Sequence, residues 1–461
     1  MSNSTATLYA AQVKIYPSYQ SGFFRKIRWS VLFFLLGIYY LIPFIRWERG
    51  GGLPNQAVLF DLPNRKFYLF DIVVWPQEIF LLTFLLILMA VGLFFMTSLA
   101  GRVFCGYMCF QTVWTDLFLA VERLFEGSRN RRMKLDREGW SLGKGLRKAG
   151  KHLAWLMIGA ATGGAFVFYF ADAPTLLGRY LDGSASFAAW FTLIFLTLTT
   201  YVMAGFAREQ VCIYMCPYAR FQGAMFDQDT LVIAYDEQRG EPRQANRRQR
   251  SDGVPGHCID CGACVRVCPT GIDIRDGQQY QCITCAACID ACDAVMDRMK
   301  LPRGLVRYTS LRELAGLPTR LLRPRVAVYG AILLLMAGGI AWNLATQAPV
   351  DLNVLRARKP LYITRSDGSI QNNYTVRVLN MTSRPQHYAL TAEGLDHAHL
   401  TVAASSNGGL NVEPGEALPF TVYLAQAAGS GQPGPQPITF HLRATDPAGG
   451  SDVYQSVFMR P

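Results

Sequence analysis

Eight of the twelve cysteines form two runs with the same spacing. The first run reads CIDCGACVRVC and the second reads CITCAACIDAC, so the cysteines are separated by two, two and three residues in both. This is the bacterial ferredoxin pattern, in which three cysteines of a run bind one 4Fe–4S cluster and the fourth binds the other cluster. The pattern predicts a first cluster on Cys258, Cys261, Cys264 and Cys292. It predicts a second cluster on Cys282, Cys285, Cys288 and Cys268.

Zinc is the alternative metal for these runs, because paired C-x-x-C motifs can also bind zinc tetrahedrally. A three-cysteine loop with a fourth cysteine at a fixed offset, present twice, is not a usual zinc spacing. The second run is followed by Asp293 where the first is followed by Pro269, a difference that removes no ligand. Two neighbouring 4Fe–4S clusters carry electrons and are not by themselves a catalytic centre.

The remaining four cysteines form two matched pairs. Both pairs have the sequence C-x-Y-M-C, start 107 positions apart and follow a long apolar segment. Cysteines four residues apart lie on one side of a helix, so two helix pairs related by an axis would bring all four together. With the methionines of the two motifs they would form a soft ligand set, which favours Cu(I) or a further iron–sulfur centre. The candidate residues are Cys105, Cys109, Cys212 and Cys216, with Met108 and Met215.

Packing is the alternative role for these pairs, because free cysteine behaves as a small apolar side chain in protein cores. Two matched pairs at equivalent places make packing the less favoured interpretation. A disulfide framework is disfavoured by where the cysteines lie. All twelve fall between Cys105 and Cys292, and the C-terminal part of the chain, which we expect to face an oxidising compartment, has none.

Five apolar segments must position these motifs. Each holds roughly 18–23 mostly apolar residues, about the length that crosses the hydrocarbon core of a membrane. Helices of soluble proteins usually have a polar face, and these segments lack one. The sequence therefore predicts a membrane protein with five transmembrane helices, near residues 28–45, 77–99, 153–170, 187–206 and 326–345.

Basic residues predict the orientation, because they are retained on the cytoplasmic side of a membrane. The loop 100–151 has eleven Lys and Arg residues and the segment 207–325 has seventeen, whereas the loop 171–186 has one. We therefore expect the N-terminus and the ferredoxin runs in the cytoplasm and the C-terminal part in the periplasm. The net charge of +12 largely reflects this bias. No nucleic-acid recognition motif accompanies it, so nucleic acid is not an expected partner.

The expected organisation has five parts. A cytoplasmic N-terminal segment, 1–24, precedes a four-helix membrane region, 25–206, whose two helix pairs resemble a parallel internal repeat. A cytoplasmic ferredoxin-like domain, 207–325, and a fifth transmembrane helix, 326–346, follow. The last part, 347–461, contains alternating runs such as YTVRVLN and ITFHLRATD between turn signals. Such runs predict an all-β sandwich.

The two pairs in their contexts, GRVFCGYMCFQTVW and VCIYMCPYARFQGAM, together with the ferredoxin runs and the β-rich tail, resemble the cytochrome c oxidase accessory protein family CcoG, also called FixG or RdxA. The resemblance covers almost the whole chain. It implies a multi-pass protein of the bacterial inner membrane with an immunoglobulin-like C-terminal domain. It also implies reduction of Cu(II) to Cu(I) for assembly of a cbb3-type oxidase, with copper ions and oxidase subunits or assembly factors as partners.

One departure from the family concerns the first pair. The family has C-x-x-x-C-P at both membrane motifs, but the first reads Cys109-Phe110 here. Because proline shapes the end of a helix, we expect the first site to differ slightly from the second.

Two functions follow from these residues. In the first, electrons pass through the two clusters to copper held by Cys105, Cys109, Cys212 and Cys216, which makes the protein a cupric reductase. In the second, the protein is a quinol-oxidising electron-transfer subunit. The sequence has no C-x-x-C-H haem motif and no evident dinucleotide fingerprint, so both require an external electron donor that the sequence does not identify. A pure scaffold with structural clusters is a third, less favoured interpretation.

The orientation can be tested with reporter fusions. A reporter enzyme that works only in the periplasm should be active when it is fused after Gln347. A reporter that works only in the cytoplasm should be active when it is fused near Gly240. The opposite pattern would place the ferredoxin runs in an oxidising compartment and contradict their role as an electron carrier.

Overall fold

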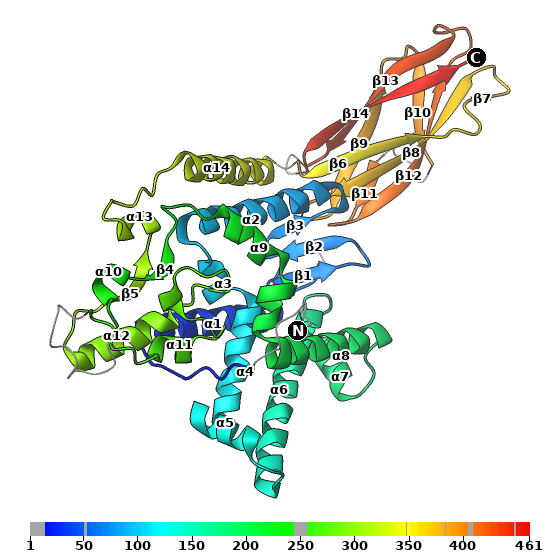
Figure 1. The fold of residues 1–461 in the computed structure, drawn as a ribbon. Coiled ribbons are helices and arrows are strands. Elements are labelled where there is room, and N and C mark those ends of the chain that lie inside the picture. The colour runs from blue at the N-terminus through cyan, green and yellow to red at the C-terminus, as the bar shows by residue number, and fades with distance from the viewer. Residues whose placement is uncertain are drawn as a thin grey trace, which may run out of the picture. The chain divides into compact units, whose positions relative to one another are not determined.

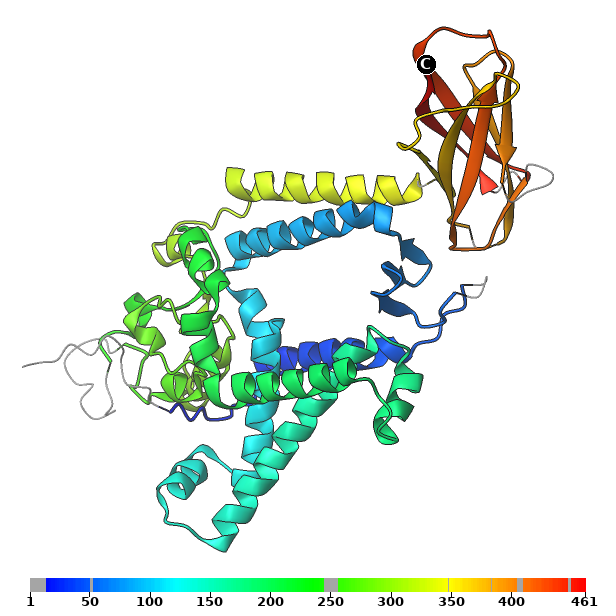
Figure 2. The same ribbon diagram turned by 90° about the vertical axis from the view of Figure 1, so that its right-hand side faces the viewer.

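A computed structural model describes residues 14–49, 53–243, 256–346, 348–382, 384–403, 409–446 and 449–461 (Figures 1 and 2). The chain divides into two compact units. The first comprises Met1–Ile45, Val58–Phe67 and Val74–Gly338, and the second comprises Arg46–Ala57, Tyr68–Val73 and Gly339–Pro461.

The first unit is mainly helical. Its longer helices contain the apolar segments, and α4 (Phe110–Glu126) and α9 (Pro217–Met225) follow the two cysteine pairs. The helices up to the ferredoxin runs are α1 (Phe23–Leu41), α2 (Ile79–Ala100), α3 (Val103–Tyr107), α4 (Phe110–Glu126), α5 (Arg129–Arg137), α6 (Leu142–Phe168), α7 (Ala173–Leu181), α8 (Phe187–Val202) and α9 (Pro217–Met225). Two π-helical turns, Met203–Ala207 and Val211–Met215, separate α8 from α9. The last long helix is α14 (Pro324–Ala345).

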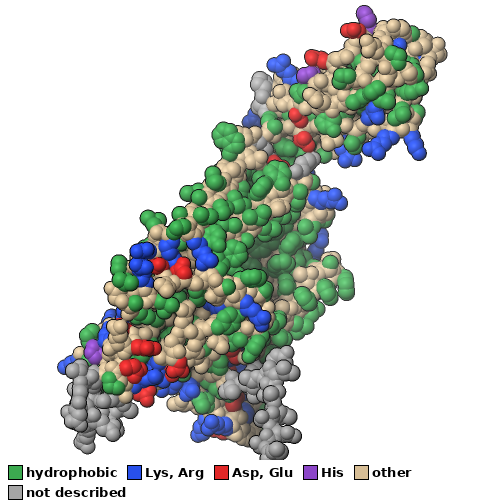
Figure 3. Space-filling view, turned by 45° about the horizontal axis from the view of Figure 1, so that its top comes forward, with side chains coloured by type: hydrophobic (Ala, Val, Ile, Leu, Met, Phe, Trp, Pro, Cys, Tyr) green, Lys and Arg blue, Asp and Glu red, His purple; other side chains and the backbone are tan. Residues whose placement is uncertain are grey.

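Five helical segments among the described residues are long and apolar enough to cross a membrane, as the sequence predicts: Phe23–Phe44, Ile79–Ala100, Val103–Glu126, Phe187–Ala207 and Pro324–Ala345. Four of them coincide with the expected segments. The fifth, Val103–Glu126, lies in the expected basic loop, and the expected span 153–170 lies instead in α6, outside these five. In Figure 3, hydrophobic side chains cover a broad part of the face of the molecule that is turned toward the viewer.

The difference between α4 and α6 has a physical reason. Helix α4 carries Asp116 and Glu122, which make its sequence read as a soluble helix, but both carboxylates are buried and ion-paired inside the protein. Helix α6 begins with lysine and arginine residues and contains several glycines, which lower its hydropathy.

Small residues let α6 and α8 pack closely. A Cβ atom at Gly163 would lie 2.8 Å from the carbonyl oxygen of Leu193, and one at Gly159 would lie 3.0 Å from that of Thr197. The sequence G-x-x-x-G is a common helix-packing motif in membranes. The hydroxyl of Tyr39 in α1 donates to the carbonyl of Thr162 at 2.8 Å, so α1 joins this group. Helix α14 lies alongside α2 in both ribbon views.

The ferredoxin-like region lies between α9 and α14. Strand β4 (Val232–Tyr235) pairs antiparallel with β5 (Val306–Thr309), and between them lie α10 (Glu237–Gly240), α11 (Ala263–Val267) and α12 (Ala287–Met299). The short helix α13 (Leu311–Leu314) follows. The carboxylate of Asp290 in α12 accepts from the backbone N–H groups of Phe24 and Arg25, at 3.2 and 2.8 Å. This region is therefore attached to the first turn of α1, whose free N–H groups it satisfies.

The C-terminal part is a β-sandwich, as the alternating runs predict. One sheet has the strand order β10-β12-β8-β6, with β7 also paired to β8, and the other has the order β11-β9-β13-β14. Buried side chains such as Tyr374, Phe440 and Phe458 fill the space between the sheets. The strands are β6 (Val350–Arg356), β7 (Ile363–Thr364), β8 (Ile370–Asn380), β9 (Gln386–Glu393), β10 (Ala398–Val402), β11 (Gly409–Val412), β12 (Ala417–Gln426), β13 (Gly434–Ala444) and β14 (Ser451–Arg460).

A small three-stranded sheet, which the sequence analysis did not predict, lies between α1 and α2 in the chain. Its strands are β1 (Val58–Asp61), β2 (Lys66–Leu69) and β3 (Ile72–Val74), in that order.

Candidate metal centre

The two ferredoxin runs adopt the same loop conformation. Asp260 and Gly262 of the first run have left-handed backbone torsions, with φ of 49° and 62°. The equivalent residues of the second run, Thr284 and Ala286, have φ of 56° and 59°. A left-handed alanine is unfavourable outside a constrained loop, so the second loop holds its shape against a local preference. Such loops turn successive cysteines toward one point.

One hollow is lined by four cysteines from both runs. They are Cys258, Cys261, Cys264 and Cys292. A thiolate on Cys292 interacts electrostatically with Cys264 and Cys258. The fourth cysteine of the second run therefore lies with the first three cysteines of the first run.

A second hollow has the complementary set. It is lined by Cys268, Cys282, Cys285 and Cys288, with Cys264 also at its wall. A thiolate on Cys288 interacts electrostatically with Cys285, Cys282 and Cys268, and less with Cys264. The fourth cysteine of each run thus lies with the first three cysteines of the other run.

The chemistry of these hollows fits iron–sulfur clusters. Burial raises the pKa of Cys282 to about 12, and it raises that of Cys288 well above its ordinary value. Thiolates there need a compensating metal charge. Among the described residues, no three His, Cys, Asp or Glu side chains are placed to hold a single metal ion. Four cysteines around a hollow suit a multi-iron cluster better than a zinc ion, whose ligand sulfurs lie about 2.3 Å from one point.

The two C-x-Y-M-C motifs also share a backbone conformation. The N–H of Cys109 donates to the carbonyl of Phe104 at 2.9 Å, and the N–H of Cys216 donates to that of Val211 at 2.8 Å. Four residues before the first cysteine of each pair, Gly101 and Arg208 have φ of 57° and 40° with ψ of −126° and −113°. These matches are what an internal repeat requires.

Each motif is hydrogen-bonded to the helical segment that precedes the other. Gln111 lies two residues after Cys109, and its side chain donates to the carbonyl of Met203 at 2.9 Å. Tyr218 lies two residues after Cys216, and its hydroxyl bonds to that of Thr97 at 2.8 Å. This reciprocal arrangement is expected of two halves related by an approximate axis.

The four cysteines of the pairs come together. Cys105 lies within electrostatic range of Cys109 and Cys212, and Cys109 within range of Cys216. Burial raises the pKa of Cys212 to about 11, with smaller contributions from Cys109 and Cys216. The Cys105 thiol donates to the side-chain oxygen of Gln222 at 3.3 Å.

The two methionines of the motifs are placed differently. Met108 is 52% exposed and Met215 is 57% exposed, whereas the cysteines beside them are partly buried. Met108 and Met215 are therefore more exposed than the partly buried thiols of the same motifs.

The expected difference between the first and second motifs is absent at the helix start. Cys109 and Cys216 both occupy the extended N-cap position, with φ of −60° and −81° and ψ of 127° and 110°. Pro217 takes the first helical position, where its missing N–H costs nothing. Phe110 begins α4 in the same way.

The first cysteine pair lies directly against the second ferredoxin run. A Cβ atom at Gly106 would lie 2.8 Å from the carbonyl oxygens of Ile283 and Thr284, so only glycine fits this helix position. Tyr107 and Tyr308 bond through their hydroxyls at 3.3 Å, and the Tyr308 hydroxyl donates to the carbonyl of Thr284 at 2.8 Å.

The sequence analysis did not predict this contact, although one difference between the two motifs indicates it. The first motif has Gly106 where the second has Ile213, and a glycine at this position allows the backbone of another segment to approach closely. Arg102 was also missed, and it reinforces the contact. Its guanidinium donates to the carbonyl of Tyr280 at 2.5 Å and stacks over the ring of that residue at 4.7 Å.

Three domain families match the chain. Residues 207–311 match a family described as "4Fe-4S dicluster domain", and residues 82–129 match one described as "4Fe-4S binding domain". Residues 340–461 match a family described as "IG-like fold at C-terminal of FixG". The dicluster match spans all eight cysteines of the ferredoxin runs.

Curated relatives match over nearly the whole chain. The nitrogen fixation protein FixG of Rhizobium meliloti is 44% identical over an alignment of 494 positions, which covers 98% of this chain and 94% of FixG. The chain belongs to the FixG family. Protein RdxB of Cereibacter sphaeroides is 45% identical, with 98% of this chain and 96% of RdxB covered. Protein RdxA of the same organism is 46% identical, with 88% and 87% covered.

One solved structure is similar to part of this chain. The crystal structure of a FixG-related protein from Vibrio parahaemolyticus is 26% identical to this chain, covering 24% of this chain and 96% of that protein with a TM-score of 0.22. The resemblance drawn from the sequence is confirmed by the curated relatives. With its 4Fe–4S domains and apolar helices, this FixG-family member is a membrane iron–sulfur protein of the electron-transfer class.

Exchange of the fourth cysteine predicts a distinctive mutant phenotype. Cys268→Ser should damage the cluster held by the second run, and Cys292→Ser the cluster held by the first run. Electron paramagnetic resonance of the reduced protein, with iron analysis, would resolve the two, because the wild type should bind about eight irons in two interacting clusters.

Two results would contradict this ligand set. Damage confined to the cluster of the mutated run would show that the fourth ligand is not exchanged. Stoichiometric zinc with almost no iron would overturn the cluster assignment.

The same iron analysis also tests the thiol pairs. About twelve irons, with a loss of about four in the variant in which Cys105 and Cys109 are serine, would place a third cluster on the thiol pairs.

Proposed function

We propose that this FixG-family protein reduces Cu(II) to Cu(I) for the assembly of a cbb3-type cytochrome c oxidase. The observation that carries the proposal is the contact of Gly106 with Ile283 and Thr284, because it joins the second ferredoxin run to the partly buried thiols. An electron-carrying region is thereby in direct contact with a soft metal-binding group.

The ligands of the two clusters would follow the exchanged pattern. Cys258, Cys261, Cys264 and Cys292 would hold the first cluster, and Cys268, Cys282, Cys285 and Cys288 the second. Each cluster, when bound, takes up and releases one electron at a time. Because Cys264 also borders the second hollow, the two ligand sets adjoin each other. The protein's residues thus form a short route from the first hollow to the second.

The next step takes the electron to the four thiols. The backbone of Ile283 and Thr284 touches Gly106, which lies between Cys105 and Cys109. A separate cavity is lined by Ile283 and Thr270 of the ferredoxin region and by Cys212 of the second pair. Both thiol pairs therefore lie near Ile283 of the second run, and Cys212 also shares this cavity with Thr270, which follows the first run.

The thiols would hold copper as the substrate. Sulfur ligands favour Cu(I) over Cu(II), so binding by these thiols would make reduction favourable. Because no three described His, Cys, Asp or Glu side chains are placed to hold a single ion, Cys105, Cys109, Cys212 and Cys216 would move closer together on binding it. One electron from the second cluster converts one Cu(II) to Cu(I). The thiols must lose protons to bind the ion, and the raised pKa of Cys212 keeps that thiol protonated until copper arrives.

The sidedness of the protein belongs to this proposal. The excess of basic residues in 207–325 supports a cytoplasmic face for the clusters and thiols, and it supports a periplasmic β-sandwich in the bacterial inner membrane. Copper would then be reduced on the cytoplasmic side. The β-sandwich would be available to oxidase subunits or assembly factors.

Serine replacement of either cysteine pair tests the proposal. Cu(II) reduction by the purified, chemically reduced protein should fall to the background rate in the variant lacking Cys105 and Cys109 and in the variant lacking Cys212 and Cys216. Because the pairs form one site, the variant lacking all four should be no slower than either. Both cluster signals should persist. Formation of Cu(I) is followed with a chromogenic Cu(I) chelator.

Exposed methionines provide the matched controls. Met108→Leu and Met215→Leu should change the rate less than about twofold, because these side chains are more exposed than the thiols. Full Cu(II) reduction without the four thiols would show that they only pack. Slow Cu(II) reduction by wild-type protein, together with rapid cluster reduction by a quinol, would favour the quinol-oxidising alternative.

A further inference from the structure

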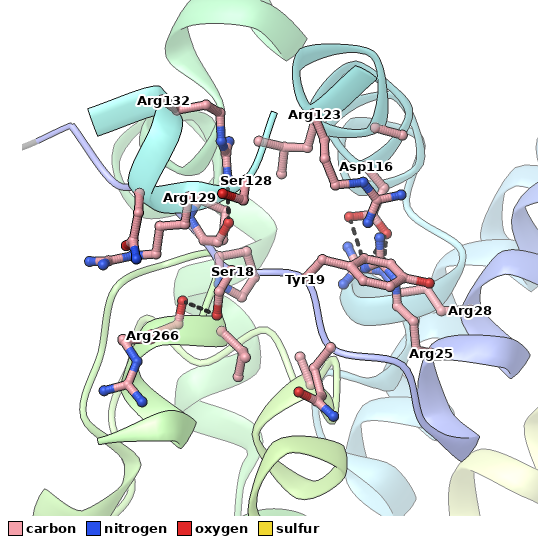
Figure 4. A pocket seen from close by; sticks show the side chains of 18 residues that line it. Ser18, Tyr19, Arg25, Arg28, Asp116, Arg123, Ser128, Arg129, Arg132 and Arg266 are labelled. Atoms are coloured by element: carbon pink, nitrogen blue, oxygen red, sulfur yellow. Dashed lines mark hydrogen bonds and ion pairs between the residues drawn. The ribbon is translucent and has the colours of Figure 1, made fainter. Parts of the chain in front are cut away.

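One further cavity in the first, mainly helical unit is lined by arginines and contains no cysteine, unlike the two cysteine hollows. Its volume is about 320 Å³, and its walls come from the N-terminal segment, α1, α4, α5 and the ferredoxin region. The charged side chains that line it are one aspartate, Asp116, and six arginines: Arg25, Arg28, Arg123, Arg129, Arg132 and Arg266. Figure 4 shows arginines on both sides of the N-terminal segment, some near Tyr19 and others near Ser128.

Three of these arginines are held by carboxylates. Asp116 is only 3% exposed and pairs with Arg28 at 2.6 Å and with Arg25 at 3.3 Å. Arg132 pairs with Glu122 at 3.2 Å. These ion pairs fix the walls of the cavity and use up the nearby negative charge.

The other three arginines form no ion pair with any described residue. Arg123 stacks over the ring of Tyr19 at 3.8 Å. Arg129 donates to the carbonyl of Tyr16 at 2.8 Å, and Arg266 donates to that of Cys261 at 2.7 Å. Their contacts orient the guanidinium groups without neutralising them, so the cavity has an excess of positive charge.

Two buried nitrogens strengthen this point. The Nε atoms of Arg25 and Arg132 are buried and have no hydrogen-bond partner among the described residues. A buried donor without a partner is costly. A multiply charged anion in the cavity would supply the missing charge near these guanidinium groups.

We propose that this cavity binds a phosphate-bearing anion. Guanidinium groups pair with phosphate oxygens through two parallel hydrogen bonds, and arginines on several walls match an anion with more than one charge. The cavity lies where α1 begins, so the phosphate could belong to a lipid headgroup at the membrane surface or to a soluble molecule. Arginine pockets beside transmembrane helices bind lipid phosphates in other proteins.

The position of the cavity gives such an anion a consequence for the metal centre. Pro269 and Ala287 line both this cavity and the second cysteine hollow. A negative charge there would favour the oxidised form of a cluster in that hollow and lower its midpoint potential. By linkage the oxidised protein binds the anion more tightly, by a factor of ten for each 59 mV of shift in a one-electron couple.

The test uses the full-length protein with its clusters, in nanodiscs of zwitterionic lipid and phosphate-free buffer. Inorganic pyrophosphate is titrated in by calorimetry, and the cluster midpoints are measured with and without it. We expect saturable binding and a lower midpoint for one cluster only. The variant with Arg123→Gln and Arg129→Gln should bind at least about tenfold more weakly and show no shift. Arg298→Gln, an exposed arginine of α12 outside the cavity, should behave as wild type.

A second arm identifies the source of the phosphate. Wild-type protein in nanodiscs of anionic phosphatidylglycerol should show the same lower midpoint without pyrophosphate if the ligand is a headgroup, and it should not if the ligand is soluble. Wild-type protein with neither pyrophosphate binding nor a midpoint shift in either lipid would overturn the proposal. Equal binding by wild type and an arginine variant that retains both cluster signals would also overturn it.

Discussion

The structure of the redox region depends on one close approach, that of the helix backbone at Gly106 to the loop of the second cysteine run. Because Gly106 has no side chain, the carbonyls of Ile283 and Thr284 can touch the segment between Cys105 and Cys109. Helix α3, the first thiol pair and the second hollow are thereby fixed to one another. The reciprocal bonds of Gln111 and Tyr218 then bring the second thiol pair to the same place.

Buried ion pairs hold this arrangement from the other side. Arg208 has an unfavourable left-handed conformation with φ of 40°, and its guanidinium pairs with Glu122 of α4 at 3.0 Å. Asp116 pairs with Arg28 in α1, and Asp290 of α12 bonds to the first backbone N–H groups of α1. Removing one partner of such a buried pair costs about 3–5 kcal/mol. The membrane helices and the ferredoxin region are therefore joined by contacts that tolerate little change.

Local patterns in the sequence were enough to predict much of this molecule. The cysteine spacing within each run, the long apolar segments and the alternating strands of the tail depend only on neighbouring residues. The features that the sequence did not reveal depend on residues far apart in the chain. The contact of Gly106 with Thr284 and the gathering of arginines around Tyr19 are of this kind. Helix α4 falls in an expected loop because its sequence contains charged residues. These charges are paired with residues of α1, α5 and the segment after α8, which neighbouring residues in the sequence do not reveal.

The central claim is that electrons reach the thiols through the contact at Gly106. The most direct measurement is the rate at which the photoreduced clusters are reoxidised after rapid mixing with Cu(II). In Gly106→Val, whose side chain must displace the Ile283 and Thr284 carbonyls, this rate should fall about tenfold or more, since displacements of about 1 Å can cost this much. Both clusters and all four thiols should remain. Ile213→Val, at the equivalent position of the second motif, should leave the rate unchanged. An unchanged rate in Gly106→Val would contradict the account.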